Sequence, residues 1–152
     1  MLYINDIVDG TSSKVRLFAD DCLLYREVKS QQDADSLQHD LESMCRWADL
    51  WQMKFNVTKC AAVTFKNSRK RKWVSYNYTM YGQSVPRTST TPYLGVNFDT
   101  GMQWTAHVNT TAAKGHRLVG MLWRNLHGCP QSLKEKSYST IVRPVVEYAG
   151  TV

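Results

Sequence analysis

The chain has 152 residues, near the usual size of one domain, with 43% hydrophobic residues and a formal net charge of +6. It shows no signal-peptide pattern and no apolar run near membrane-spanning length, so we expect an intracellular protein of the nucleus or cytoplasm. Its four cysteines lack C-x-x-C or zinc-ligand spacing, which favours reduced, mostly buried thiols over disulfides or a metal site.

Two short apolar runs flank the adjacent carboxylates Asp20 and Asp21. Both runs are rich in strand-forming residues, so 15–25 is predicted to form a β-hairpin with the acidic pair at its tip. No Gly or Asn relaxes the turn, and burial between apolar strands would oppose ionisation of both groups. Mg²⁺ would remove that conflict, and two such ions suit phosphoryl or nucleotidyl transfer. A solvated acidic turn is the alternative interpretation.

A helix is predicted after the hairpin. Ser30 to Asp33 resembles a capping box, with Asp where Glu or Gln is usual. Apolar residues then recur at alternating steps of four and three up to about Met53: Leu37, Leu41, Met44, Ala48 and Trp51. This stripe predicts that the helix packs on the sheet that carries the hairpin.

The middle of the chain is predicted to contain strands. We expect strands at 60–65 and 73–81, because the second alternates apolar and polar residues, and a further strand at 93–99. The intervening loop 66–72 is strongly basic. It is interpreted as a contact with backbone phosphates, a nuclear-localisation patch or a plain exposed turn.

The last third is predicted to be helical. From Trp104 to Leu126 the apolar positions fall in one wide arc at 100° per residue, and three cations lie opposite: Lys114, Arg117 and Arg124. Such a helix can pack through one face and meet phosphates with the other. A second helix is predicted from Gln131 until Pro144 disturbs it.

The charges are unevenly divided along the sequence. Residues 1–50 contain five Lys/Arg and ten Asp/Glu, a balance of −5, whereas 51–152 contain fourteen and three, a balance of +11. An acidic end that holds cations and a basic body that holds phosphates are typical of a protein that acts on nucleic acid. A solvated basic surface without a partner is the alternative.

Phe18-Ala19-Asp20-Asp21 between apolar strands resembles the active-site hairpin of reverse transcriptases. Four further segments extend the resemblance in order and spacing: Leu2–Ile7, Trp51–Cys60, Tyr93–Asp99 and Val142–Ala149. Together they cover essentially the whole chain and resemble the reverse transcriptases of non-LTR (LINE) retrotransposons, of the jockey-like kind.

The resemblance implies an α+β fold, as part of a right-hand polymerase. Residues 1–100 are then the C-terminal part of the palm (the antiparallel hairpin plus helix) with the primer-grip region, and 101–152 are a truncated helical thumb. The intact enzyme would be an RNA-directed DNA polymerase, a nucleotidyltransferase that uses Mg²⁺ and dNTPs to extend a DNA primer on an RNA template.

The resemblance also implies catalytic roles. Asp20 would be the main metal ligand of this segment and Asp21 its supporting neighbour. Lys59 matches the position of a lysine that protonates the pyrophosphate leaving group, a form of general acid catalysis. A surface lysine without a role is the alternative.

Further residues are implied in nucleic-acid binding. Phe18 and Ala19 would lie beside the primer terminus. Tyr93, Leu94 and Gly95 resemble the primer grip, where the missing Cβ of Gly95 allows close backbone approach, although a bulge in a short strand explains this glycine equally well. The cations of the long helix, Lys114, Arg117 and Arg124, would meet the phosphates.

The family's enzymes carry fingers and most of the palm before this hairpin, including a third metal-binding Asp. Because few residues precede the hairpin here, we expect a fragment that needs the upstream palm and fingers and is inactive alone. Two alternatives stay open. One is a catalytically inactive nucleic-acid-binding remnant, and the other is a pseudogene product without function, whose exposed half-core drives aggregation.

Overall fold

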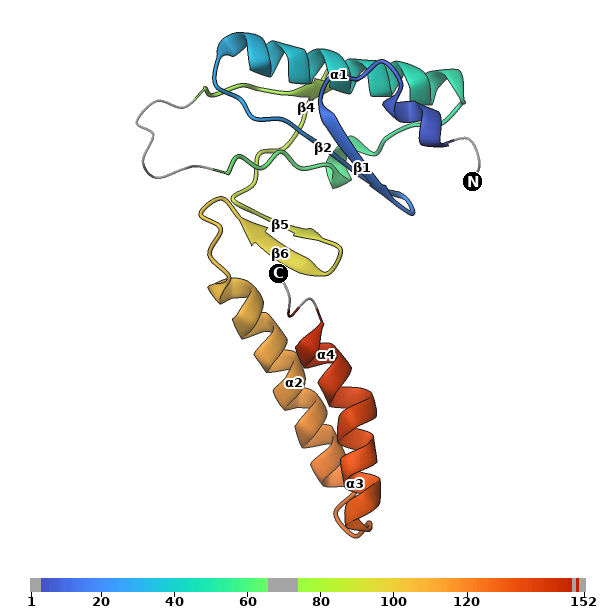
Figure 1. The fold of residues 1–152 in the computed structure, drawn as a ribbon, viewed down its shortest axis with the longest axis vertical. Helices are drawn as coiled ribbons and strands as arrows, with labels where there is room; N and C mark the ends of the chain where they lie inside the picture. Colours follow the sequence, from blue (N-terminus) through green and yellow to red (C-terminus); the bar gives the residue numbers. More distant parts are fainter. Residues whose placement is uncertain (1–3, 66–73, 149, 151–152) are drawn as a thin grey trace. The chain divides into compact units, whose positions relative to one another are not determined.

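The computed structural model describes residues 4–65, 74–148 and 150 (Figure 1). The chain divides into two compact units, Met1–Ser89 and Thr90–Val152. Helices and small antiparallel sheets occur together, so the predicted α+β class is confirmed. None of the helices in the described part is long and apolar enough to cross a membrane.

The first unit starts with a short 3-10 helix, η1 (Ile4–Val8), followed by the predicted hairpin of β1 (Lys14–Phe18) and β2 (Asp21–Tyr25). Phe18 pairs with Asp21, which leaves Ala19 and Asp20 as a two-residue turn. Side chains alternate between half-buried and exposed along both strands, as the two-residue period of a strand requires. The hairpin is therefore confirmed, with the acidic pair at its tip.

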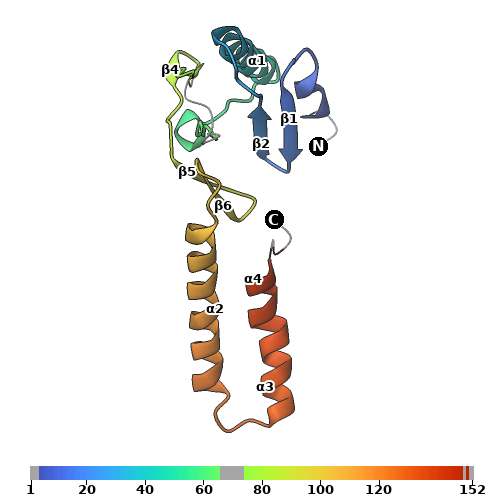
Figure 2. The ribbon, with the colours of Figure 1, turned by 60° about the vertical axis from the view of Figure 1, so that its left-hand side comes forward.

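Helix α1 (Gln31–Leu50) crosses the base of the hairpin, and the two strands extend away from it (Figures 1 and 2). The capping box is confirmed, because the Asp33 N–H donates to Ser30 Oγ at 3.2 Å and the Ser30 N–H donates to Asp33 Oδ2 at 2.9 Å. Met44 and Ala48 of the apolar stripe are buried, which fixes the inward face of the helix. The helix ends at Leu50, slightly before the expected end.

The strands predicted at 60–65 and 73–81 are wrong for the most part. In the described residues of these ranges, pairing is limited to the bridge Ala62–Arg87 and to β3 (Thr79–Met80), which pairs with β4 (Gln83–Ser84). Thr79 also bonds a side chain of α1: the Gln38 amide donates to the Thr79 carbonyl at 3.0 Å and accepts from the Thr79 N–H at 2.9 Å. The basic loop 66–72 lies outside the described residues.

A small core joins these pieces. It contains Cys45 from α1 and three residues from later segments, Val57, Met80 and Val85. Val57 opens a second 3-10 turn, η2 (Val57–Lys59). Burial of this side chain fastens the turn to the core, so the segment before and after it is held against α1.

The second unit opens with a hairpin of β5 (Thr90–Tyr93) and β6 (Val96–Asp99), so the strand predicted at 93–99 is confirmed for 96–99 but is interrupted by a turn at 94–95. Leu94 and Gly95 form a two-residue turn with φ of +47° and +78°. Two positive φ values match the twist of a tight hairpin and reverse the chain there. The Asp99 carboxylate then accepts hydrogen bonds from the Gly101 and Gln103 N–H groups, which shapes the approach to the next helix.

The predicted helices follow. Helix α2 (Thr105–Asn125) packs against a second helical rod that starts at Gln131, as predicted: α3 (Gln131–Ser137), the π-helical turn η3 (Tyr138–Val142) and α4 (Arg143–Glu147) (Figure 2). Pro144 disturbs this rod without ending it, since the π turn comes just before the proline. Gly115 is buried between the rods, and a Cβ there would lie 2.9 Å from Val146 Cγ2.

Candidate functional site

The hairpin tip brings together four of the predicted site residues: Phe18, Ala19, Asp20 and Asp21. Ala19 has a φ of +51°, a left-handed conformation that costs an L-residue about 1 kcal/mol. Such conformations persist where the surrounding structure holds them, and they are frequent at functional sites. The two-residue turn is therefore strained at Ala19.

Both carboxylates are exposed, contrary to the expectation that apolar strands bury them. Neither accepts a hydrogen bond from, or forms an ion pair with, another residue in the part of the chain that the structure describes. Their oxygens are hard donors of the kind that Mg²⁺ prefers, and this ion needs only one or two carboxylates. Asp20 and Asp21 thus fit a magnesium ion as a partial ligand set. Among the described residues, no group of three or more His, Cys, Asp or Glu side chains is arranged to hold a metal.

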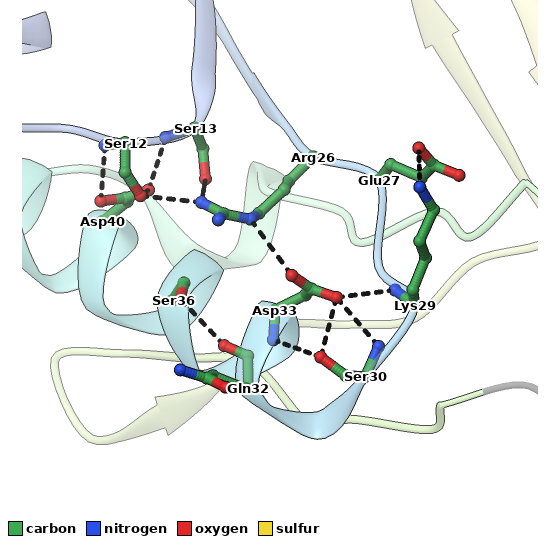
Figure 3. A network of polar contacts seen from close by, with 10 residues as sticks. All are labelled: Ser12, Ser13, Arg26, Glu27, Lys29, Ser30, Gln32, Asp33, Ser36 and Asp40. Carbon is green, nitrogen blue, oxygen red and sulfur yellow. Dashed lines mark hydrogen bonds and ion pairs between the residues drawn. The ribbon is translucent and has the colours of Figure 1, made fainter.

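The base of the hairpin is fastened to α1 by a polar network (Figure 3). Asp40 is 2% exposed, and its carboxylate accepts from the Ser12 N–H at 3.0 Å, the Ser12 hydroxyl at 3.0 Å and the Ser13 N–H at 2.7 Å. Burial alone raises the pKa of Asp40, but the combined hydrogen bonds from Ser13 and Ser12 outweigh it and hold that pKa below its usual value. Asp40 is therefore a charged anchor for the strand entering the tip.

The strand leaving the tip joins the same network. Arg26 Nη1 donates to Ser12 Oγ at 2.7 Å, and its Nε lies 4.0 Å from Asp33 Oδ1 (Figure 3). The pKa of Asp33 is lowered first by the backbone N–H of Lys29 and then by Ser30, as expected of a carboxylate in a capping box. Both ends of the hairpin are thus tied to one helix.

Cys22 follows the acidic pair and points to the half-buried face of the hairpin. Burial raises the pKa of this thiol from 9.0 to about 11, and nearby Cys60 adds to the shift. The thiol is therefore protonated at neutral pH and is a poor nucleophile. All four cysteines are free, and only Cys45 is buried, whereas mostly buried thiols were expected.

Lys59 ends the turn η2 with its side chain exposed. Asn56 caps the turn, because its Oδ1 accepts from the Thr58 N–H at 3.1 Å and from the Thr58 hydroxyl at 2.7 Å. Together with buried Val57, this cap fixes the backbone that carries Lys59 and leaves the ammonium group in solvent.

The segment before Lys59 lines a surface hollow of about 350 Å³. Its one cation, Lys54, lies 5.1 Å from the centroid of the Tyr81 ring, a cation–π contact. The remaining lining is neutral. The hollow therefore lacks the converging charges expected of a phosphate site.

In the second unit, the turn Leu94–Gly95 is covered by a side chain from near the end of the chain. The Tyr148 hydroxyl donates to the Leu94 carbonyl at 2.8 Å, and a Cβ on Gly95 would lie 3.0 Å from Tyr148 Cε1. Gly95 thus does permit a close approach, and the contacting group here is Tyr148. Tyr93 is half-buried, with its ring 6.5 Å from that of Phe98.

The three cations of α2, Lys114, Arg117 and Arg124, are exposed as predicted. Arg117 Nε reaches only its own helix, where it donates to the Ala113 carbonyl at 3.3 Å. The apolar arc is less uniform than predicted, because Leu118 and Leu122 are half-buried whereas Val119 is exposed.

Sequence analysis missed Asp40 and Arg26. One signal was available: Asp40 stands three residues after Leu37 and four before Met44, within the inward-facing stripe. A carboxylate at such a position needs a partner, because burial of an unpaired charge is costly. The partner itself, the backbone before β1, was not readable from the local sequence.

The chain is similar to two curated proteins named RNA-directed DNA polymerase from mobile element jockey. It is 28% identical to that of Drosophila melanogaster over 145 residues, and 30% identical to that of Drosophila funebris over 139 residues. These matches cover 93% and 89% of the chain but only 16% and 15% of the relatives, so the chain spans a small part of their length. No family model and no solved structure matches it.

Proposed function

We propose that the chain is the C-terminal palm and thumb region of a non-LTR retrotransposon reverse transcriptase. The observation that carries the proposal is the hairpin whose strained two-residue turn presents Asp20 and Asp21 to solvent, in a chain similar to jockey polymerases over most of its length. In the intact enzyme this region would take part in extending a DNA primer on an RNA template with dNTPs.

Each part of the chain would have one task. Asp20 and Asp21 would hold Mg²⁺, which when bound supplies positive charge against the nucleotide phosphates. Phe18 and Ala19, exposed beside them, would border the primer terminus. The exposed ammonium of Lys59 would carry the proton that the departing pyrophosphate accepts.

The second unit would bind the nucleic acid. The turn of Tyr93, Leu94 and Gly95, held by Tyr148, would support the primer strand. The exposed cations of α2, Lys114, Arg117 and Arg124, would contact phosphates through a face that helix packing leaves free.

The test uses the chain joined to the remaining polymerase sequence of a jockey relative. Asp20→Asn should abolish primer extension while leaving nucleic-acid affinity within a few fold, because metal-held charge acts in the transition state whereas phosphate contacts carry binding. Asp9→Asn makes the same charge change at an exposed site outside the tip and should keep activity. Near-normal extension by Asp20→Asn would remove the carboxylate pair from the mechanism.

Lys59 is tested in the same background. Lys59→Ala should slow extension by about 10²–10⁴-fold if the lysine is a general acid. Lys54→Ala, in the same segment, is the matched control and should have little effect on the rate. Equal losses in both variants would show a general charge effect instead.

For the chain by itself we propose nucleic-acid binding without synthesis. This second function is favoured because, among the described residues, no group of three or more His, Cys, Asp or Glu side chains joins the two tip carboxylates in a fuller metal ligand set. Primer extension by the purified chain on an RNA template with Mg²⁺ and dNTPs measures this directly. Template-dependent synthesis that disappears in Asp20→Ala would overturn it.

A further inference from the structure

We propose that Asp40 is a positioning residue whose carboxylate, together with Arg26, fixes the direction of the β1–β2 hairpin on α1 and so the place of Asp20 and Asp21. The inference rests on the proposed function, in which the two tip carboxylates are the metal ligands. Asp40 and Arg26 lie far from the reacting atoms, and they would act on the tip only through the backbone of the two strands.

The strand entering the tip is held by the two residues just before it, Ser12 and Ser13. Asp40 takes three donors there, the two N–H groups of Ser12 and Ser13 and the Ser12 hydroxyl, at 2.7–3.0 Å. Hydrogen bonds to a charged acceptor are roughly twice as strong as neutral ones. Since Asp40 is 2% exposed, water does not compete for these bonds, and the start of β1 has one position on the helix.

The strand leaving the tip is held by the same helix face. Asp33 and Asp40 are seven residues apart, which places them on one side of α1, about 10.5 Å apart along its axis. Arg26, directly after β2, connects to both carboxylates. Its guanidinium donates to Ser12 Oγ at 2.7 Å, which itself donates to Asp40, and it lies 4.0 Å from Asp33. The hairpin is therefore clamped at both ends of its base (Figure 3).

The tip lacks comparable ties within the described residues. Phe18, Ala19, Asp20 and Asp21 are all exposed, and the tip carboxylates have no described hydrogen-bond donor. The position of the acidic pair then depends on the base and on the stiffness of the two strands between them.

Strand length makes this dependence steep. Five residues of strand span about 17 Å, so a rotation of about 5° at the base moves the tip by about 1.5 Å. A misplacement of about 1 Å in catalytic geometry can cost about 100-fold in rate. A small loosening at Asp40 would thus be enough to misplace the carboxylates without unfolding the hairpin.

The experiment measures residual dipolar couplings of the ¹⁵N-labelled chain. In Asp40→Asn, the couplings of residues 14–25 should shrink relative to those of residues 31–50, because the hairpin keeps its internal pairing but loses its single orientation. Asp49→Asn is the matched control, with the same charge change at an exposed site of the same helix, and should leave the ratio unchanged. A carboxylate that only stabilises the fold would lower the unfolding midpoint without changing these couplings, and that result would overturn the proposal.

A second variant covers failure of Asp40→Asn to fold. Arg26→Gln removes the partly exposed guanidinium that links the residue after β2 to Ser12 and Asp33, but it keeps the Asp40 bonds, so it should give a smaller change of the same sign. If Asp40→Asn is unfolded and the folded Arg26→Gln variant has unchanged couplings, that result would also count against the clamp that Asp40 and Arg26 form at the base of the hairpin.

A third measurement separates this inference from the proposed function. Mn²⁺ serves as the probe, and it should broaden the amide signals of residues 19–22. Asp40→Asn should weaken that binding measurably, because a hairpin loosened at its base no longer holds the two tip carboxylates in one place. Absence of broadening in the unsubstituted chain would count against the metal ligands, and the couplings would still decide the clamp. Tip broadening of equal strength in both proteins, with unchanged couplings, would overturn the clamp and leave the metal ligands standing.

Discussion

At the residue scale, Asp40 makes the first unit sensitive to acid. Its hydrogen bonds with Ser13 and Ser12 outweigh burial, so the pKa of the folded carboxyl lies below its usual value. The stabilisation is then complete above the unfolded pKa of about 3.9, and it is lost as pH falls through the lower pKa of the folded state. We expect Asp40→Asn to be less stable than the unsubstituted chain at neutral pH, with a difference that shrinks on acidification. Urea unfolding at a series of pH values measures it, and a difference independent of pH would contradict the assignment.

Cys22 gives a second residue-level prediction. A pKa raised from 9.0 to about 11 lowers the thiolate fraction near pH 8 by about 100-fold. Alkylation of Cys22 by iodoacetamide should therefore be about 100-fold slower in the folded chain than in urea, as followed by mass spectrometry of the peptide. Equal rates in both states would mean that the thiol beside Asp21 is open and reactive.

At the scale of elements, the packing of α2 on α4 depends on Gly115. Replacing a helical Gly with Ala normally stabilises by about 1 kcal/mol, but here the new Cβ would lie 2.9 Å from Val146 Cγ2. Valine is stiff in a helix and cannot easily turn away, so overpacking should make Gly115→Ala destabilising by about 1 kcal/mol. In a Val146→Ala background the same change should stabilise instead. Thermal unfolding of the unsubstituted chain, the two single variants and the double variant gives the coupling energy between positions 115 and 146. Additive effects of the two substitutions would contradict this packing.

The same scale shows why local sequence predicted helices better than strands. The hairpin 14–25 and the capping box at Ser30 were predictable, because their signals lie within a few residues. The segment 74–78 does keep its predicted alternation, with half-buried and exposed side chains in turn, but the alternation breaks at the half-buried Thr79. Its strand pairing is confined to Thr79 and Met80, and the backbone of Thr79 also bonds the Gln38 amide, a partner distant in sequence.

The turn Leu94–Gly95 was missed for a related reason. Leucine at a φ of +47° is unfavourable by about 1 kcal/mol, so the sequence does not carry the usual Asn-Gly or Asp-Gly signal of such a turn. The compensating hydrogen bond comes from the Tyr148 hydroxyl, far along the chain. Of the candidate sites, the acidic tip was readable locally, whereas the residues that hold both turns became visible only in the fold.

At the scale of the whole molecule, the charge asymmetry does not follow the division into units. Residues 1–89 hold thirteen Lys/Arg and ten Asp/Glu, and residues 90–152 hold six and three, so each unit has a balance of +3. The acidic stretch and much of the basic stretch of the sequence therefore fall within the first unit's bounds. In the second unit, the cations lie on two helical rods, which offers an internal comparison.

That comparison gives the last prediction, for nucleic-acid binding by the chain itself. We expect weak, sequence-independent binding to RNA–DNA hybrid and to single strands, with log affinity falling linearly with log salt. Each phosphate neutralised contributes about 0.7–0.9 to the slope, so joint replacement of Lys114, Arg117 and Arg124 by Ala should flatten it by about 2–3 units. Alanine favours helix, and these side chains are exposed, so circular dichroism should show an intact fold.

The matched control replaces three cations of the other rod, Lys134, Lys136 and Arg143, with the same loss of charge. Arg143 already pairs with Glu147 at 2.7 Å, and Lys134 Nζ donates to the His127 carbonyl at 3.2 Å, so these groups are less free to meet phosphates. Their removal should flatten the slope less than removal of the α2 cations. If both triple variants flatten the salt slope equally, the effect depends on net charge alone. If the α2 triple variant leaves the slope unchanged, the cationic face of α2 is an ordinary solvated surface.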